Sequence, residues 1–200
     1  MNRGQTARFY PWEDFKGARV NRFSFLSALP VIFDMTNGPM ELFQLIAAQK
    51  NQRAVGYIQT LAQENEKNIA GATAAGLKVG VYFYSQAINA EEAAEEAAFV
   101  LNAIRPYKVT FPVVFDWEIV GGSDARTYTV SRAVLCESAK TFCSAVEDAG
   151  YDAMIYFTQY LGYRKYILRQ LSDYEFWYAE YEAKPRIVFN FDMWQYSSTG

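Results

Sequence analysis

The sequence predicts an α/β protein with a β/α barrel, and three observations support this. From residue 53 onward, short apolar strands alternate with amphipathic helices, which is typical of a parallel sheet. Polar and aromatic side chains gather where the predicted strands end, as they do in β/α barrels. The chain has 200 residues, of which 51% are hydrophobic, and no Pro/Gly/Ser-rich linker divides it. We therefore expect a single domain over residues 1–200.

The first half of the chain contains three predicted strands and two predicted helices. Residues 63–75 form a helical pattern that Gly76 ends, because glycine is a common C-terminal cap. Asn89 is expected to cap an Ala- and Glu-rich helix that runs to Ile104, with acidic residues in its first turn. The predicted strands are Leu29–Asp34, Arg53–Ile58 and Leu77–Ser85.

The second half continues the same alternation. A long amphipathic helix is predicted over Ser131–Ala149 and a second helix over Gln159–Leu171. The predicted strands are Thr110–Trp117, Ala153–Phe157, Glu175–Tyr181 and Phe191–Tyr196. This gives seven strands, one fewer than an eight-stranded ring needs. The strand count therefore favours a TIM-like β/α barrel and leaves open that it is incomplete at its C-terminal end.

A doubly wound open sheet is the alternative to a barrel, and the strand ends favour the barrel. No glycine-rich phosphate loop of the GxGxxG or GxxxxGK type follows any strand, which disfavours a nucleotide site. A barrel collects its functional side chains from the ends of many strands. The strand-end residues are Tyr82, Tyr84, Asp116, Glu118, Tyr156, Tyr178, Glu180, Trp194 and Tyr196.

Two carboxylates end the apolar strand that begins at Phe111. Asp116 and Glu118 are two residues apart, so in a strand they share one face at a spacing of ~6.5 Å along the chain. Close carboxylates at the end of a buried strand cost energy, which is typical of a functional acid pair. A structural pair held by Arg or Lys is the alternative. Trp117 alternates with the two acids and is expected to pack in the core.

Composition excludes several classes of function. The chain has no histidine, which rules out Ser-His-Asp and Cys-His catalysis and histidine-bound zinc within it. With 22 acidic and 19 basic residues, the net charge of -3 offers no footprint for nucleic acid. No apolar run reaches the ~20 residues of a membrane span. We expect no metal and no organic cofactor.

Two further clusters are interpreted as structural. Cys136 and Cys143 lie ~10 Å apart along a predicted helix, too far for a disulfide, and are expected to be buried thiols. An acidic cluster in the preceding helix is expected to be a solvated face. Its members are Glu91, Glu92, Glu95 and Glu96.

Five segments in this order resemble the glycoside hydrolase family 25 lysozymes, the Chalaropsis-type muramidases. They fall within residues 53–200, about three quarters of the chain. They are Ala75–Ser85 (AGLKVGVYFYS), Asp116–Glu118 (DWE), Ala149–Tyr156 (AGYDAMIY), Trp177–Tyr181 (WYAEY) and Asp192–Gly200 (DMWQYSSTG). Residues 1–52 diverge from the family, and the closing strand with a further acidic residue is not found before Gly200.

The resemblance implies an irregular TIM-like β/α barrel and a peptidoglycan hydrolase that cleaves the β-1,4 bond between N-acetylmuramic acid and N-acetylglucosamine. Glu118 would be the proton donor, and Asp116 would stabilise charge or orient the 2-acetamido group of the substrate. Asp34 is the loose counterpart of the acid that family members carry in their first strand. The implied partner is the glycan strand of peptidoglycan, met by a monomer at the cell wall or outside the cell.

Several strand-end side chains are expected to contact the sugars, because flat aromatic rings suit stacking on sugar rings. The alternative for each is ordinary packing in the barrel. The expected substrate-binding residues are Tyr84, Tyr156, Tyr178, Glu180, Asp192 and Trp194. A second hypothesis for the whole chain is a catalytically inactive glycan-binding barrel derived from the same family.

Overall fold

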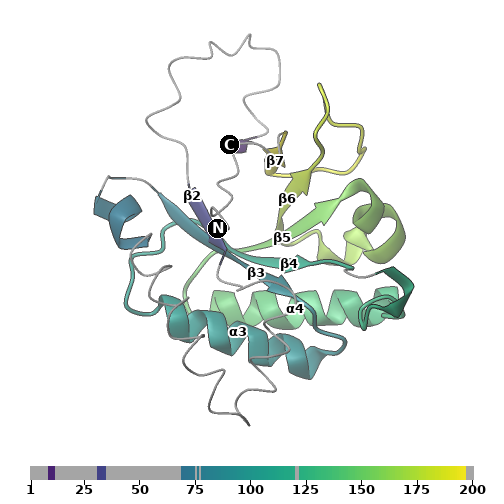
Figure 1. Ribbon diagram of the computed structural model, residues 1–200, viewed down its shortest axis with the longest axis horizontal. Helices are drawn as coiled ribbons and strands as arrows, with labels where there is room; N and C mark the ends of the chain where they lie inside the picture. The colour runs from purple at the N-terminus through teal and green to yellow at the C-terminus, as the bar shows by residue number, and fades with distance from the viewer. Residues whose placement is uncertain are drawn as a thin grey trace.

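The computed structural model describes residues 69–74, 76, 78–119 and 122–196 in full, and 9–11 and 31–34 by their backbone (Figure 1). The predicted strand over residues 53–58 lies outside these ranges. The strands are β1 (Phe9–Pro11), β2 (Val31–Asp34), β3 (Val79–Ser85), β4 (Val113–Trp117), β5 (Ala153–Thr158), β6 (Glu175–Ala179) and β7 (Met193–Gln195). The two long helices are α3 (Ala90–Ile104) and α4 (Arg132–Asp148), and a short helical segment covers residues 69–74.

The strands form one sheet in the order β1-β7-β6-β5-β4-β3-β2. From β2 to β7 each strand is parallel to its neighbour and follows it in the chain, whereas β1 is antiparallel to β7. A doubly wound sheet would reverse its strand order at a switch point. The order does not reverse, and α3 and α4 both cover the same face (Figure 1). This confirms an α/β fold of barrel type whose sheet, in the described part of the chain, has β1 and β2 as open edges.

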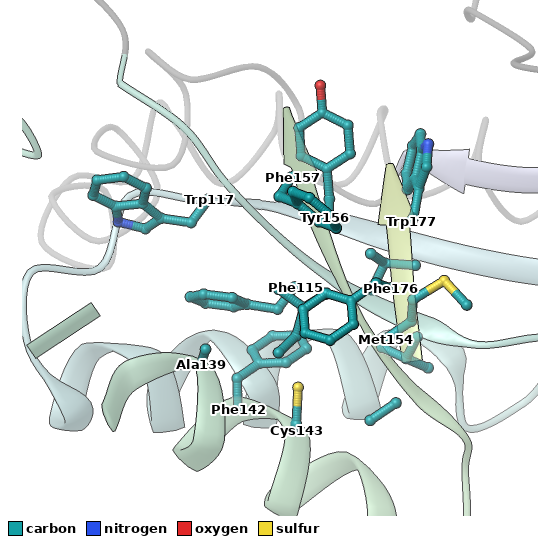
Figure 2. Packing of buried hydrophobic residues seen from close by; sticks show 14 of the residues in the cluster. Phe115, Trp117, Ala139, Phe142, Cys143, Met154, Tyr156, Phe157, Phe176 and Trp177 are labelled. Carbon is teal, nitrogen blue, oxygen red and sulfur yellow. The ribbon is translucent and has the colours of Figure 1, made fainter. Parts of the chain in front are cut away.

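The main core lies between β3–β6 and the two long helices. Phe115 of β4 packs against Phe142 of α4 with ring centroids 5.2 Å apart (Figure 2). Trp117 is fully buried, as predicted, and its indole N–H donates to the carbonyl oxygen of Ala87 at 2.9 Å. Cys136 and Cys143 are buried free thiols on α4, and burial raises the pKa of both. The burial of Trp117 and of both thiols therefore agrees with the predictions from the sequence.

Both long helices begin and end as their sequences predict. The side chains of Asn89 and Ser131 accept hydrogen bonds from backbone N–H groups in the first turns of α3 and α4. Gly150, with φ +85°, follows α4 in the left-handed conformation that glycine adopts without strain. No helix in the described ranges combines the length and apolar character needed to cross a bilayer.

Replacing Asn89 with alanine is expected to lower the free energy of unfolding by about 1 kcal/mol. The Asn89 Oδ1 atom accepts from the backbone N–H of Glu92 at 2.8 Å, and alanine would leave that donor without its cap. Denaturant unfolding measures the change. Asn102→Ala, the same substitution at an exposed position inside α3, is the control and should not destabilise the protein. Equal stabilities of wild type and Asn89→Ala would contradict the prediction.

The predicted helix over residues 159–171 is wrong in type. A π-helical turn (η3, Leu161–Lys165) and a 3-10 turn (η4, Leu168–Leu171) replace it. Between them Tyr166 has an extended backbone, and its side chain is fully buried. Gly162 lies so close to the Phe157 ring that an added Cβ would meet it at 2.9 Å. Tertiary packing against β5 therefore overrides the helical pattern.

Candidate active site

Asp116 and Glu118 lie at the carboxyl end of β4, near the middle of the sheet. Asp116 pairs in register with Tyr84 of β3, so the two side chains share a face of the sheet. Asp116 is buried, whereas Glu118, one residue beyond the strand, is partly exposed. By alternation both acids are on the face opposite Phe115 and α4. The strand thus presents the pair on the face that the long helices leave uncovered.

Tyr156 of β5 joins this pair. Its phenol lies close enough to the Glu118 side chain to feel the charge of that carboxylate. Burial raises the pKa of Tyr156, and the negative charges of Glu118 and Asp116 raise it further, so the phenol stays protonated and can donate. Its ring meets Trp177 of β6 edge-on at 4.8 Å, and both rings lie on the side of the sheet away from Phe142 (Figure 2). The acid pair therefore sits beside an aromatic wall.

Tyr181 is a neighbour of the site that the sequence analysis missed. Burial raises its pKa, and Glu118 and Asp116 raise it further, which places the phenol near both acids. The side chain is 54% exposed, and its hydroxyl accepts a hydrogen bond from Gln195 Nε2 at 3.3 Å. The alternation of side chains in an extended segment could have identified Tyr181, because it lies four residues after Trp177 and so shares its face.

The structure also places Tyr84 and Asp34 at this end of the sheet. Tyr84 is half-buried and lies on the same face as Asp116. Asp34 is the last residue of β2 and pairs in backbone register with Tyr82 of β3. The strand that Asp34 ends is thus two strands away from the strand that carries Asp116.

Tyr178, Glu180 and Trp194 form a separate group on the other face. Tyr178 pairs in register with Phe157 and Trp194, whereas its neighbour Trp177 pairs with Tyr156. The Tyr178 hydroxyl donates to Glu180 Oε2 at 2.8 Å, and the Trp194 indole N–H donates to the Glu180 carbonyl oxygen at 2.9 Å. The sequence grouped these three residues with the acid pair because they end strands. The alternation of side chains along the strands puts them on the opposite face.

Glu180 anchors the segment that follows β6. Its carboxylate accepts hydrogen bonds from the Arg186 backbone N–H at 2.7 Å and from Arg186 Nε at 2.5 Å. Burial opposes ionisation of Glu180, but these bonds and the one from Tyr178 outweigh it and lower the pKa. The geometry therefore gives Glu180 a structural role, which is to hold the 181–190 segment.

Asp192 lies at the opposite end of the sheet from Glu118. It precedes β7, and its Oδ2 accepts a hydrogen bond at 2.8 Å from the N–H of Phe176, near the start of β6. Its own N–H donates to the Phe176 carbonyl oxygen at 2.9 Å. The structure thus brings Asp192 to the amino-terminal edge of the sheet and not to the acid pair.

The acidic face of α3 is not uniformly solvated, which corrects the prediction for Glu96. Glu96 is 4% exposed and accepts hydrogen bonds from Ser85 Oγ at 2.5 Å and from the Gln86 N–H at 3.1 Å. Burial raises its pKa from 4.5 to about 7. Glu92 forms an ion pair with Arg126 at 2.7 Å. Within the described ranges, no three acidic or cysteine side chains are placed to hold a metal ion.

The fold is shared at low sequence identity with solved structures of an autolysin, a glycosyl hydrolase and an endolysin. The modular autolysin LytC from Streptococcus pneumoniae, solved with a synthetic peptidoglycan ligand, matches with 21% identity and a TM-score of 0.56 over 67% of this chain and 33% of that chain. The glycosyl hydrolase 25 GHIP of Streptococcus pneumoniae matches with 20% identity and a TM-score of 0.54 over 68% of this chain and 58% of that one. The chain thus spans about a third of the length of LytC.

The catalytic domain of an endolysin from a Listeria monocytogenes bacteriophage matches with 19% identity and a TM-score of 0.52, over 68% of this chain and 66% of that one. A search of curated protein sequences found no match. The family model of the glycosyl hydrolases family 25 matches residues 46–200, which include every residue of the acid pair and its aromatic wall. The chain therefore belongs to glycosyl hydrolases family 25.

Proposed function

We propose that the protein hydrolyses the β-1,4 bond between N-acetylmuramic acid and N-acetylglucosamine in peptidoglycan, with Glu118 as the proton donor. The observation that carries the proposal is the partly exposed Glu118 beside buried Asp116 at the carboxyl end of β4, with the Tyr156 phenol close to both acids. Membership of family 25 supports the same assignment. Action on this substrate would take place at the cell wall or outside the cell.

In the proposed first step, the Glu118 carboxyl group donates its proton to the glycosidic oxygen as the bond from C1 of the muramic acid to that oxygen breaks. The negative charge of Asp116 stabilises the oxocarbenium-like transition state and orients the 2-acetamido group. The acetamido oxygen then bonds to C1, so no nucleophile from the protein is needed. Glu118, now a carboxylate, takes a proton from the water that opens this intermediate, and the configuration at C1 is retained.

The sugars would lie along the aromatic side chains of the uncovered face. Three tyrosines border the acid pair: Tyr84 in β3, Tyr156 in β5 and Tyr181 just beyond β6. We propose these three as the sugar contacts and keep Asp34, which ends β2, as a candidate third acid. Tyr178, Glu180, Trp194 and Asp192 would support the site from other faces of the fold.

A wall-lysis assay with a sedimentation assay tests the function. The purified protein is incubated with insoluble peptidoglycan, and both the bound protein and the reducing ends released are measured. The proposal expects new reducing ends on muramic acid. Binding without release of reducing ends would overturn it and favour an inactive glycan-binding barrel.

Replacing Tyr156 with phenylalanine is expected to lower kcat by about 10- to 100-fold and to leave KM nearly unchanged. The Tyr156 hydroxyl lies beside Glu118, and a hydrogen bond from it to Glu118 would strengthen as Glu118 gives up its proton and becomes charged. A hydrogen bond to a charged group contributes about 1.5–3 kcal/mol. Tyr160→Phe, at an exposed tyrosine just beyond β5, is the matched control. An unchanged kcat in Tyr156→Phe would contradict this assignment.

A further inference from the structure

We propose that Gln86, held in place by the buried Glu96 of α3, is a positioning residue that fixes Glu118 for proton donation. The inference rests on the proposed function of Glu118 and deepens it. Glu118 is the first residue beyond β4, and the register of β3 with β4 ends one residue earlier, at Trp117. The Glu118 carbonyl group therefore lies beyond the strand pairing, and side chains hold it instead.

Two buried side chains donate to the carbonyl oxygen of Glu118. Gln86 Nε2 lies 3.1 Å from it, and Thr127 Oγ1 lies 3.3 Å from it. Gln86 is 3% exposed and Thr127 is fully buried. The same Gln86 amide also donates to the carbonyl oxygen of Ser85 at 2.9 Å, which fixes its orientation. The carbonyl of Glu118 is thus held by two donors that have little freedom to move.

Glu96 in turn holds the turn that carries Gln86. One carboxylate oxygen accepts from Ser85 Oγ and the other from the backbone N–H of Gln86. Ser85 Oγ also accepts from the N–H of Ala87 at 3.3 Å, and the carbonyl of Ala87 accepts from the Trp117 indole. A buried carboxyl group is costly unless it is fully hydrogen-bonded, so its presence here needs a reason beyond packing. Positioning of the turn after β3, which carries Gln86, supplies that reason.

Arg126 closes the network from the segment after β4. Its guanidinium donates to the carbonyl oxygen of Gln86 at 3.1 Å and to both oxygens of Glu92, at 2.8 Å and 2.7 Å. Arg126 and Thr127 are adjacent, so one loop contacts both the Gln86 turn and Glu118. The charged groups that face Glu96 are Glu92 from its own helix and Arg126 from this loop. The proton donor is therefore tied to α3 through a continuous set of hydrogen bonds.

The experiment compares wild type with Gln86→Met, which keeps the length of the side chain and removes its donor. With a soluble glycan fragment as substrate, kcat is expected to fall at least tenfold while KM and sedimentation with peptidoglycan stay unchanged. Gln170→Met, the same change at an exposed position, is the control and should match wild type. Thr127→Val removes the second donor and is also expected to lower kcat. It is the test variant if Gln86→Met does not fold.

A second readout separates this proposal from the proposed function. The ¹³C chemical shift of the Glu118 carbonyl reports its hydrogen bonds and is expected to move in Gln86→Met but not in Gln170→Met. If the wild type releases no reducing ends, the proposed function fails, and the carbonyl shift still decides the positioning. An unmoved carbonyl shift in Gln86→Met, or an unchanged kcat in an active protein, would overturn the positioning proposal. A loss of stability with unchanged kcat would also overturn it.

Discussion

Replacement of Glu118 by glutamine is expected to lower the rate of peptidoglycan cleavage by a factor of about 10² to 10⁴. Glutamine has nearly the same shape but no proton that it can give to the glycosidic oxygen. Because Glu118 is partly exposed, its replacement leaves no buried charge without a partner, and the free energy of unfolding should change by less than ~0.5 kcal/mol. Release of reducing ends measures the rate, and denaturant unfolding measures the stability.

Glu137→Gln is the matched control, because Glu137 is an exposed acid on α4, which packs against the other face of the sheet. This variant should clear cell walls as fast as wild type. Binding to insoluble peptidoglycan should survive in Glu118→Gln, since the aromatic side chains remain. Wild-type rates in Glu118→Gln would remove Glu118 from the chemistry and direct attention to Asp116.

The second large effect concerns stability and Glu96. Burial raises the pKa of Glu96 to about 7 from an ordinary value of 4.5, against the lowering effect of hydrogen bonds from Ser85 and Gln86. Between these pH values the unfolded chain loses the proton while the native state keeps it. The free energy of unfolding must therefore fall as pH rises from about 4.5 to about 7 and level off above that. At about 1.4 kcal/mol per pH unit, the contribution of Glu96 amounts to about 3 kcal/mol.

Glu96→Gln removes this contribution, because an amide does not ionise. Relative to wild type, the variant should gain stability progressively between about pH 5 and pH 7. Urea unfolding at a series of pH values gives the two curves. Glu95→Gln, a neighbouring change at an exposed acid of the same helix, should follow the wild-type curve. Parallel curves for wild type and Glu96→Gln across this interval would show that Glu96 ionises normally in the native protein.

Strands β2 to β7 and the acid pair could be predicted from local sequence because their signals are short in range, whereas β1 was not predicted. The apolar run before Asp116 identified β4, and the spacing of Asp116 and Glu118 placed both acids on one face. Asn89 and Ser131 fixed the starts of the helices, since capping depends on neighbouring residues alone. The sequence also favoured the barrel, and the unreversed strand order agrees with it.

The features that the sequence did not reveal depend on tertiary contacts and on which face of the sheet a side chain occupies. Glu96 looks like any other acid of α3 until the β3 turn is placed over it. The π-helical turn after β5 depends on the approach of Gly162 to Phe157. Tyr178 was grouped with the acid pair because it ends a strand, although its parity puts it with Phe157 on the helix-covered face. Strand-end position without parity is therefore an incomplete guide to a site.

The pairing of β1 with β7 bears on the order in which the protein can assemble during translation. Residues 9–11 leave the ribosome long before residues 193–195, yet these two segments are partners in the sheet. Each of β3 to β7 can dock onto the strand made just before it, because neighbours in the sheet are also neighbours in the chain. Among the described strands, β1 must instead wait through nearly the whole of synthesis, so the nascent sheet grows from β2 toward β7 and is completed by its earliest segment last.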